Sequence, residues 1–348
     1  MTELVCVGTF TPAAGGEGTG VHVFTRDART GGLTGVGRPA AADAPTFLAA
    51  GPGGRVLYAL DGWADGGVRA FAVARSGALR DLGVRPAGGA VPCHLTVTPD
   101  GRYVLVAHYG SGSVSVHRLS PQGQVGERTD LVSFEGSGPD ADRQDRAHVH
   151  QVSAGPGGTV RVTDLGADAI RVFRLHRGRL LPGPVAAARP GSGPRHLAVH
   201  RDGRLLVTNE LDSTVSVFAE DATGELRERA TLPSTLSPPR ERNYPSEITI
   251  APDGRFAYVA NRGANTVTTF GIGATTVEPV AETPVEGEWP RHLTRIGDHL
   301  YVANERSHAV TIFAVDSRTG VPQFTGRAAG VASPACVVPV SRRRTPSR

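Results

Sequence analysis

The sequence contains no lysine, few aromatic residues, three cysteines and no long apolar run. All 37 basic side chains are arginines, and aromatic residues make up 5% of the chain. No stretch alternates basic side chains with stacking aromatic rings, which is the pattern typical of a nucleic-acid-binding surface. We therefore expect no nucleic-acid partner. The absence of lysine itself carries no functional conclusion.

Membrane insertion and disulfide bonding are not expected either. No apolar run approaches the ~20 residues that a membrane-spanning helix needs. The N-terminal segment MTELVCVGTF carries Glu3 in place of a basic region and enters a strand-like pattern at once, so we predict no signal peptide and a cytoplasmic location. Cys6, Cys93 and Cys336 form neither a CxxC pair nor a disulfide framework, which predicts reduced thiols.

Several catalytic motifs are missing as well. The chain has no GxSxG elbow, no P-loop and no GxGxxG fingerprint in a βαβ context, which argues against serine-nucleophile and dinucleotide chemistry. The HVH triplet at 148–150 would place two imidazoles on one face of a strand. It lacks a third ligand at diagnostic spacing, and a Ca²⁺ site built from channel oxygens is the rival possibility. We predict no metal and no cofactor.

What the chain does contain is a repeated motif. An apolar pair, Asn, a short polar turn and Val recur in LVTNELDSTV, YVANRGANTV and YVANERSHAV, with looser copies elsewhere. The slot after Asn holds Glu in two of these copies and Arg in the third. The copies are spaced by 43 to 56 residues and begin at 5, 58, 105, 161, 206, 258 and 301.

The repeat predicts a β-propeller. A strand-like run such as HLTVTPDG (94–101) precedes each motif, and runs such as VSVFAE (215–220) follow it, so each unit holds four short strands. The segment 335–340 supplies the innermost strand of the blade that begins at the N-terminus, which closes the ring. We therefore predict an all-β fold of seven four-stranded blades, with one domain over 1–340 and a disordered basic tail over 341–348.

Polar side chains should gather at one mouth of the central channel. The innermost strand of a blade begins at this mouth and the second strand ends there, so residues from both positions ring one opening. The recurrent Asn can also be interpreted as structural, with its side chain holding the following turn. His94, His196 and His292 recur at one position of the blade, and they too can be interpreted as structural hydrogen-bonding residues. The mouth residues are His94, His148, His150, Arg195, His196, Glu247, Arg291 and His292 from strand starts, and Asp61, His108, Asp164, Glu210, Arg262 and Glu305 from strand ends.

The repeats resemble the seven-bladed lactonase family, which includes propeller-type 6-phosphogluconolactonases and carboxy-cis,cis-muconate cyclases. The resemblance covers essentially the whole chain. Its most specific segments are GSGPRHLAVHRDGRLLVTNEL and HQVSAGPGGTVRVTDLGAD, and YPSEITIAPDGRFAYVANRG is shared more widely among propellers. The sequence departs from the family pattern at His108, where Asn is common, and at Phe10, where Tyr is common.

The resemblance implies catalytic roles for His150, Arg195, Glu210 and Arg262. From the predicted mouth we add further substrate-binding candidates, which are His94, His148, Asp164, His196 and Arg291.

The implied activity is hydrolysis of a sugar lactone, with 6-phosphogluconolactone as the leading substrate. The two arginines would clamp the anionic group and polarise the carbonyl, and either His150 or Glu210 would be the general base. A muconate-type cycloisomerase and a non-enzymatic interaction propeller are the alternatives. We expect a small anionic lactone as the partner, and a monomer or weak homo-oligomer.

Overall fold

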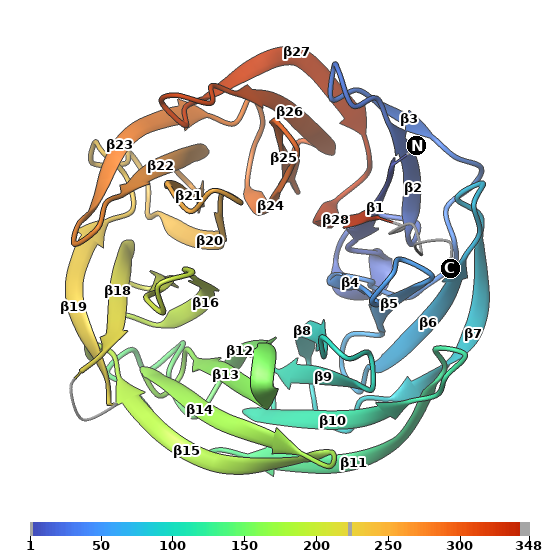
Figure 1. Ribbon diagram of the computed structural model, residues 1–348, viewed down its shortest axis with the longest axis horizontal. Helices are drawn as coiled ribbons and strands as arrows, with labels where there is room; N and C mark the ends of the chain where they lie inside the picture. Colours follow the sequence, from blue (N-terminus) through green and yellow to red (C-terminus); the bar gives the residue numbers. More distant parts are fainter. Residues whose placement is uncertain (1–2, 222–224, 342–348) are drawn as a thin grey trace, which may run out of the picture.

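The computed structural model describes residues 3–221 and 225–341. The described chain forms seven four-stranded antiparallel sheets arranged as blades around a central axis (Figure 1). This confirms the predicted seven-bladed propeller. The predicted disordered tail over 341–348 lies outside the described residues, apart from Ser341. No helix in the described part of the chain has the length and apolar character of a membrane-spanning segment.

The four strands of each blade run outward from the axis in chain order, except where the chain ends meet. The innermost strands are β4 (Leu48–Ala50), β8 (Pro92–Val97), β12 (Val149–Ala154), β16 (Pro194–Val199), β20 (Tyr244–Ile250), β24 (Pro290–Ile296) and β28 (Pro334–Val340). The second strands are β1 (Glu3–Thr9), β5 (Val56–Asp61), β9 (Tyr103–His108), β13 (Thr159–Asp164), β17 (Leu205–Asn209), β21 (Phe256–Arg262) and β25 (His299–Asn304).

The outer half of each blade is more exposed. The third strands are β2 (His22–Arg26), β6 (Gly67–Val73), β10 (Ser113–Leu119), β14 (Ala169–His176), β18 (Thr214–Glu220), β22 (Thr266–Ile272) and β26 (Ala309–Val315). The outermost strands are β3 (Leu33–Gly35), β7 (Leu79–Pro86), β11 (Val125–Ser133), β15 (Arg179–Ala187), β19 (Leu226–Pro233), β23 (Val277–Pro284) and β27 (Pro322–Gly330).

The two ends of the chain share one blade, as predicted. Strand β28 pairs antiparallel with β1, so the red C-terminal strand lies beside the blue N-terminal one (Figure 1). Cys6 and Cys336 lie on these neighbouring strands, and both are buried free thiols. This closure completes the ring because it pairs the edge strands that an open array would expose.

Both faces of each blade are buried against its neighbours. On β1, Leu4 and Cys6 pack into the core shared with the blade of β4–β7, whereas Val5 and Val7 pack into the core shared with the blade of β24–β27. Alternate residues of a strand point to opposite faces. The second strands therefore read as continuous apolar runs, which is the pattern that made the repeat visible in the sequence.

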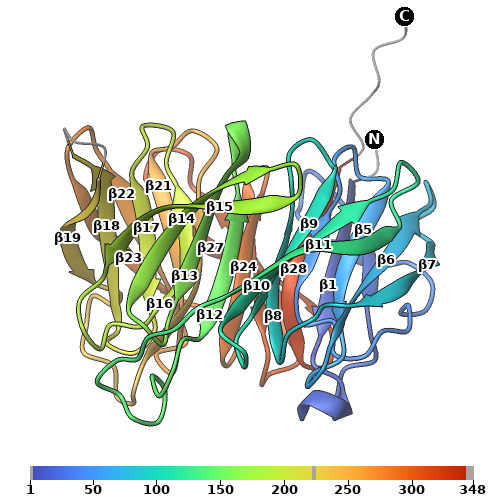
Figure 2. The same ribbon diagram turned by 90° about the horizontal axis from the view of Figure 1, so that it is seen from below.

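Two short 3₁₀ helices mark the two faces of the disc. Helix η1 (Pro12–Ala14) follows the second strand β1, at the end where the inner strands begin, and it projects from the lower face in Figure 2. Helix η2 (Pro156–Gly158) connects the inner strand β12 to β13 on the opposite face. The predicted mouth residues belong to the face of η1.

The recurrent Asn ties the second strand to the third. Asn209 donates to Ser216 Oγ at 2.7 Å, Asn261 to Thr268 Oγ1 at 3.0 Å and Asn304 to Thr311 Oγ1 at 2.9 Å. In each case the hydroxyl lies seven residues downstream. The predicted structural role of Asn is therefore present, but the amide bonds across the hairpin to the next strand, whereas the sequence suggested a bond within the turn.

We predict that Asn261→Ala lowers the free energy of unfolding by about 1–3 kcal/mol, because it leaves buried partners unsatisfied. Asn261 is fully buried, and its amide also donates to Ser234 O and accepts from Asn243. Denaturant unfolding followed by circular dichroism measures the change. Val280→Thr is the control, because Val280 is 50% exposed in the same blade and should change stability by less than about 0.5 kcal/mol. Equal stability of the two variants would contradict the structural role.

Candidate active site

A β-bulge occurs at the same place in six of the inner strands. The pairing register with the second strand shifts by one residue near the start of β8, β12, β16, β20, β24 and β28. In four of them the extra residue is Cys93, His150, Arg195 or Arg291. A bulge breaks the alternation of side chains between the faces of a strand. Consecutive residues can therefore both face the channel, as Arg195 and His196 do.

A buried carboxylate lies at the centre of the site. Glu210, directly after β17, is 4% exposed and both of its oxygens are paired with arginines. Arg143 Nη2 donates to Oε1 and Arg262 Nη2 donates to Oε2, each at 2.7 Å. Arg195 Nε lies 2.8 Å from Oε2, an ion pair whose direction does not meet hydrogen-bond geometry. Three cations thus share one anion.

This imbalance of charge perturbs the ionisation of the whole cluster. Burial favours the neutral form of Glu210, but Arg262, Arg195, His150 and Arg143 outweigh it and hold the pKa of this carboxyl well below its ordinary value. Burial, followed by the neighbouring Arg262, lowers the pKa of Arg195 to about 9. Glu210 is therefore ionised and Arg195 is still protonated at neutral pH. The surplus positive charge favours an additional anion.

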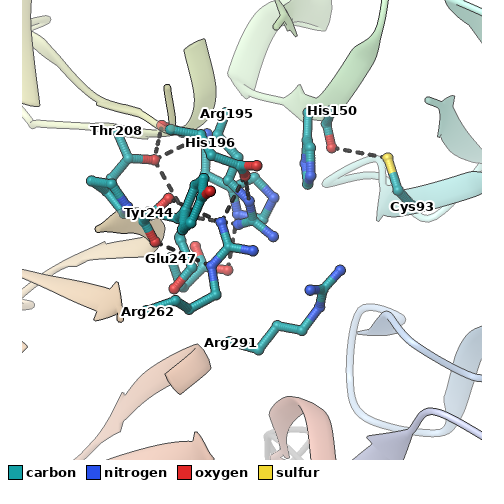
Figure 3. Close-up of polar contacts among 12 residues, drawn as sticks. Cys93, His150, Arg195, His196, Thr208, Tyr244, Glu247, Arg262 and Arg291 are labelled. Atoms are coloured by element: carbon teal, nitrogen blue, oxygen red, sulfur yellow. Dashed lines mark hydrogen bonds and ion pairs between the residues drawn. The ribbon is translucent and has the colours of Figure 1, made fainter. Parts of the chain in front are cut away.

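The two arginines are also held by the channel backbone. Arg195 Nη1 donates to Ser246 O at 2.7 Å, and Arg262 Nε donates to Tyr244 O at 3.1 Å. Figure 3 shows the side chains of Arg195 and Arg262 close together, with the Arg291 side chain below them and apart from them. These contacts fix the direction of each guanidinium before any ligand arrives, which lowers the cost of binding.

Next to this cluster lies a cavity of about 30 Å³, which is room for about one water molecule. The four bulge residues Cys93, His150, Arg195 and Arg291 all line this cavity. It is also lined by Thr46, Phe47, Trp63, His196, His292 and Ala335.

The imidazoles around this cavity are neutral. Burial, with a further contribution from Arg195, lowers the pKa of His150 well below its ordinary value. Burial lowers the pKa of His196 well below its ordinary value in the same way. Because a neutral imidazole carries one nitrogen with a free lone pair, the cavity is lined by proton acceptors.

Aromatic rings form the outer part of the site. Arg262 lies 5.7 Å from the centre of the Trp289 ring and 5.9 Å from that of Tyr244, and Arg291 lies 4.6 Å from that of Phe10. Trp289 and Tyr244 are partly exposed. Cations over aromatic faces are stabilised where water is partly excluded. The rim therefore holds the arginines without neutralising them.

The structure brings together most of the residues predicted for the site. Glu210, Arg195 and Arg262 are in direct contact, and His150, His196 and Arg291 line the adjoining cavity. The opposite charges that follow Asn in the repeat thus meet, because Glu210 and Arg262 come from neighbouring blades. The third member of that slot, Glu305, lies 3.5 Å from Arg291.

Three of the predicted substrate-binding residues point elsewhere. Asp164 is fully buried, accepts from the backbone of His148 and pairs with Arg171, so its carboxylate is taken up within its own blade. The His148 ring stacks on Tyr109, and its Nε2 lies 2.8 Å from Asp145 Oδ1.

His94 is the third of these residues. Its ring packs against Phe47, with the ring centres 4.0 Å apart. It is not among the residues that line the cavity. The geometry gives all three residues structural contacts, and substrate binding by them stays a prediction.

Metal binding finds no geometric support in the part of the chain that the structure describes. Within residues 3–221 and 225–341, no three His, Cys, Asp or Glu side chains are grouped so as to hold an ion. The HVH pair is divided by the bulge of β12, so that His148 contacts Asp145 whereas His150 lines the cavity.

Sequence reasoning missed Arg143 and the aromatic rim. Arg143 lies in the long connection 134–148 between β11 and β12, outside the repeated frame, and reaches both Glu210 and the Tyr109 hydroxyl. The rim residues Trp63 and Trp289 are likewise in connections. The only available signal was that Trp63 follows the end of a second strand and Trp289 precedes an inner strand, which places both tryptophans of the chain at the same face.

A wider groove, of about 1260 Å³, lies on the opposite face of the disc. Its walls are turns between strands, around 51–56, 100–103 and 118–127. It contains none of the predicted site residues and no buried ionic cluster. Size alone therefore does not locate the chemistry in this fold.

The chain is a seven-bladed propeller that holds a buried arginine–glutamate cluster beside neutral imidazoles. The chain matches the family described as "Lactonase, 7-bladed beta-propeller" over residues 4–339. It belongs to this lactonase family, as the sequence resemblance implied.

Individual relatives agree with this assignment. The chain is 30% identical to a 6-phosphogluconolactonase of Bacillus subtilis, over 97% of this chain and 98% of that protein. It is 29% identical to a 6-phosphogluconolactonase of Formosa agariphila, over 90% and 93% of the two chains. The crystal structure of a periplasmic gluconolactonase of Pseudomonas aeruginosa superimposes with a TM-score of 0.89 at 29% identity, over 99% and 100% of the chains.

We predict that the protein loses stability as the pH falls below about 6.5. His94, His150, His196 and His292 are neutral in the folded state because burial lowers the pKa of each below its ordinary value of 6.5. In the unfolded chain each takes up a proton below that pH, so acid favours unfolding. The slope should approach about 1.4 kcal/mol per pH unit for each histidine.

Denaturant titrations at pH 7.5, 6.5 and 5.5 measure this dependence. His94→Gln should reduce the slope, because it removes one of the titrating groups. A free energy of unfolding that stays constant from pH 7.5 to pH 5.5 would show that these histidines are not held neutral.

Proposed function

We propose that the protein hydrolyses 6-phosphogluconolactone to 6-phosphogluconate at the mouth of its central channel. The observation that carries this proposal is the surplus of positive charge where Arg195 and Arg262 share Glu210 beside the cavity. Such a cluster suits a substrate with an anionic group and a carbonyl that becomes an oxyanion. Membership of the lactonase family and the names of two relatives support the same substrate.

The arginines would supply binding and transition-state stabilisation. Attack of water on a lactone carbonyl makes a tetrahedral intermediate with a negative oxygen, and preorganised cations stabilise that charge. Arg195 and Arg262 are held in place by backbone carbonyls and by Glu210, so little reorganisation is needed. Arg291, paired only loosely with Glu305 at 3.5 Å, would bind the phosphate of the substrate.

Of the two bases considered from the sequence, His150 suits the role and Glu210 does not. Both oxygens of Glu210 are paired with arginines, which hold its pKa well below the ordinary value and keep it ionised between them. His150 lines the cavity, and its Nδ1 is buried with no hydrogen-bond partner in the described chain. Glu210 acts as the counter-ion that aligns the arginines.

A cytoplasmic location and a place in the pentose phosphate pathway would follow from this substrate. The Pseudomonas relative is described as periplasmic, so membership of the family leaves the compartment open. Fractionation of the source cells, followed by immunodetection, tests the location directly.

We predict that 6-phosphogluconolactone is hydrolysed with a kcat/KM at least tenfold above that of unphosphorylated gluconolactone. The phosphate adds charge-assisted hydrogen bonds to an arginine-rich mouth. Proton release in weakly buffered solution measures both reactions, with uncatalysed opening subtracted. Preference for the plain lactone would exclude the phosphorylated substrate. Turnover of a carboxymuconate alone would favour the cycloisomerase, and no turnover at all would favour an interaction propeller.

We predict that Arg262→Ala lowers kcat/KM by about 10²–10³-fold, the loss typical of removing one oxyanion donor. Its effect on stability should be limited, because Glu210 keeps Arg195 and Arg143 as partners. Arg255→Ala is the matched control, since Arg255 lies in the same blade on the opposite face and is paired with Asp253. Activity of Arg262→Ala within threefold of the control would remove Arg262 from the site.

A further inference from the structure

A second buried carboxylate, Glu247, lies behind two of the histidines that line the cavity. Glu247 on β20 lies between the inner strands β16 and β24 of the two neighbouring blades. Its Oε2 is 3.0 Å from His196 Nδ1 and 3.3 Å from His292 Nε2, and its Oε1 accepts from the backbone N–H of Ile248 at 3.1 Å. Figure 3 shows His196 above Glu247 next to the arginines.

The hydrogen bonds assign the protons of this group. The backbone N–H of Val337 donates to His292 Nδ1, so the proton of His292 is on Nε2, which lies 3.3 Å from Glu247 Oε2. Glu247 Oε1 accepts from the backbone of Ile248. An ionised carboxylate can only accept, so the 3.0 Å bond to Glu247 places the proton of His196 on Nδ1 and leaves a lone pair on Nε2.

His196 Nε2 has no partner among the described residues. It is buried, and the ring belongs to the lining of the cavity. Buried polar atoms are nearly always hydrogen-bonded, so an unpaired one in a polar cavity of this size indicates a ligand or a catalytic role. The ring is 5.1 Å from that of His150 and 5.3 Å from that of His94, measured between ring centres.

The arrangement is specific to one blade. Counting back from the turn that follows each inner strand, the equivalent positions in six blades are Phe47, His94, Gln151, His196, Glu247 and His292. Only one of these residues is acidic, and both of its neighbours around the ring are histidines. A regular structural layer would not need that sequence of residue types.

We propose that His196 is a catalytic base of the lactonase and that Glu247 is the positioning residue that orients it, an inference that rests on the proposed lactone hydrolysis. A carboxylate behind an imidazole holds the correct tautomer and stabilises the imidazolium that forms during the reaction. His150 lines the same cavity, but no carboxylate among the described residues is hydrogen-bonded to its ring, whereas Glu247 is bonded to His196. This assignment therefore moves the base from His150, the better of the two bases considered from the sequence, to His196. Burial raises the pKa of Glu247, which makes it the more effective partner for a proton.

Water adds to the lactone carbonyl, and the ring then opens. His196 Nε2 takes a proton from a water molecule while the water oxygen bonds to the carbonyl carbon of the lactone. The carbonyl oxygen becomes an oxyanion beside Arg195 and Arg262. When the intermediate collapses, the bond between the carbonyl carbon and the ring oxygen breaks. The imidazolium then returns its proton to the ring oxygen, and the product is the open-chain hydroxy acid.

Several charged or titratable groups set the pH dependence of His196. Burial and Arg195 lower its pKa, and the carboxylate of Glu210 acts in the opposite direction. A negative charge next to an imidazole raises its pKa, because it stabilises the protonated form. Loss of the Glu247 charge should accordingly lower the pKa of His196 further. The groups that face it are His94, His150, Arg195, Glu210, Glu247, Arg262 and His292.

The test uses Glu247→Gln, which keeps the shape of the side chain and removes the charge. We expect kcat to fall by about 10²–10⁴-fold, KM to change less than threefold and the melting temperature to stay within a few degrees. The acid limb of kcat/KM should move to lower pH. His196→Gln should lose as much, and the double variant no more than either single one, because the two residues act as a unit.

The matched controls are His200→Gln and Asp202→Asn. These residues form another imidazole–carboxylate pair, 2.7 Å apart, at the other end of β16 and away from the cavity. Both substitutions should lower the free energy of unfolding without changing kcat. If Glu247→Gln keeps full kcat, or loses stability while its acid limb stays in place, the pair is structural and the inference is wrong.

The lactonase activity and the role of His196 can be tested independently of each other. If the unmodified protein hydrolyses no lactone, the lactonase proposal fails before these variants are compared. If the unmodified protein is active, Arg262→Ala is inactive and both His196→Gln and Glu247→Gln retain activity, the arginine site stands and only the role of His196 is excluded.

Discussion

The site depends on one buried anion shared by three cations. Glu210 is held by Arg143, Arg195 and Arg262, which come from a connection and from two neighbouring blades. A buried ion pair gains little net stability, because both charges lose their hydration. Here the cations outnumber the anion, so the cluster is stable enough to fold and still attracts a further negative group. That excess of positive charge is the physical basis of the proposed lactone site.

The bulges of the inner strands make this cluster possible. In a regular strand Arg195 and His196 would point to opposite faces, and one of them would be lost to the interface between blades. The register shift between Pro194 and His196 lets both reach the axis. The same device at Arg291 and His292 brings a second Arg–His pair to the cavity, two blades along the ring. Each blade can thus supply two adjacent functional side chains.

The repeat made much of this predictable from sequence. The frame around Asn places Glu210 and Arg262 directly after or at the end of second strands, and ring closure then brings neighbouring blades together. This is why two opposite charges separated by more than fifty residues could be expected at one mouth, and their contact at 2.7 Å agrees.

The direction of individual side chains was not predictable. Asp164 occupies the position of the repeat that holds Asn in other blades, and it was expected at the mouth. Seven residues downstream, where those blades have the Ser or Thr that Asn bonds, this blade has Arg171. The Asp164 carboxylate pairs with Arg171 and therefore lies within its own blade. His148 is drawn away by Asp145 in a connection that has no repeat. Arg143 lies in the same connection. Repeats predict positions in the blades, and connections between blades are set by local partners alone.

The surroundings of Glu210 and Glu247 shift the pKa values of these two carboxylates of one channel in opposite directions. Arginines surround the first and hold its pKa well below the ordinary value, whereas burial raises the pKa of the second, which faces imidazoles. The pattern, with pKa values pushed apart by opposite surroundings, separates charge binding from proton transfer in other two-carboxylate sites. Glu210 is locked as a counter-ion because its oxygens are occupied. Glu247 is the carboxylate whose partner can gain a proton, so acid–base chemistry in this channel belongs on the side of His196.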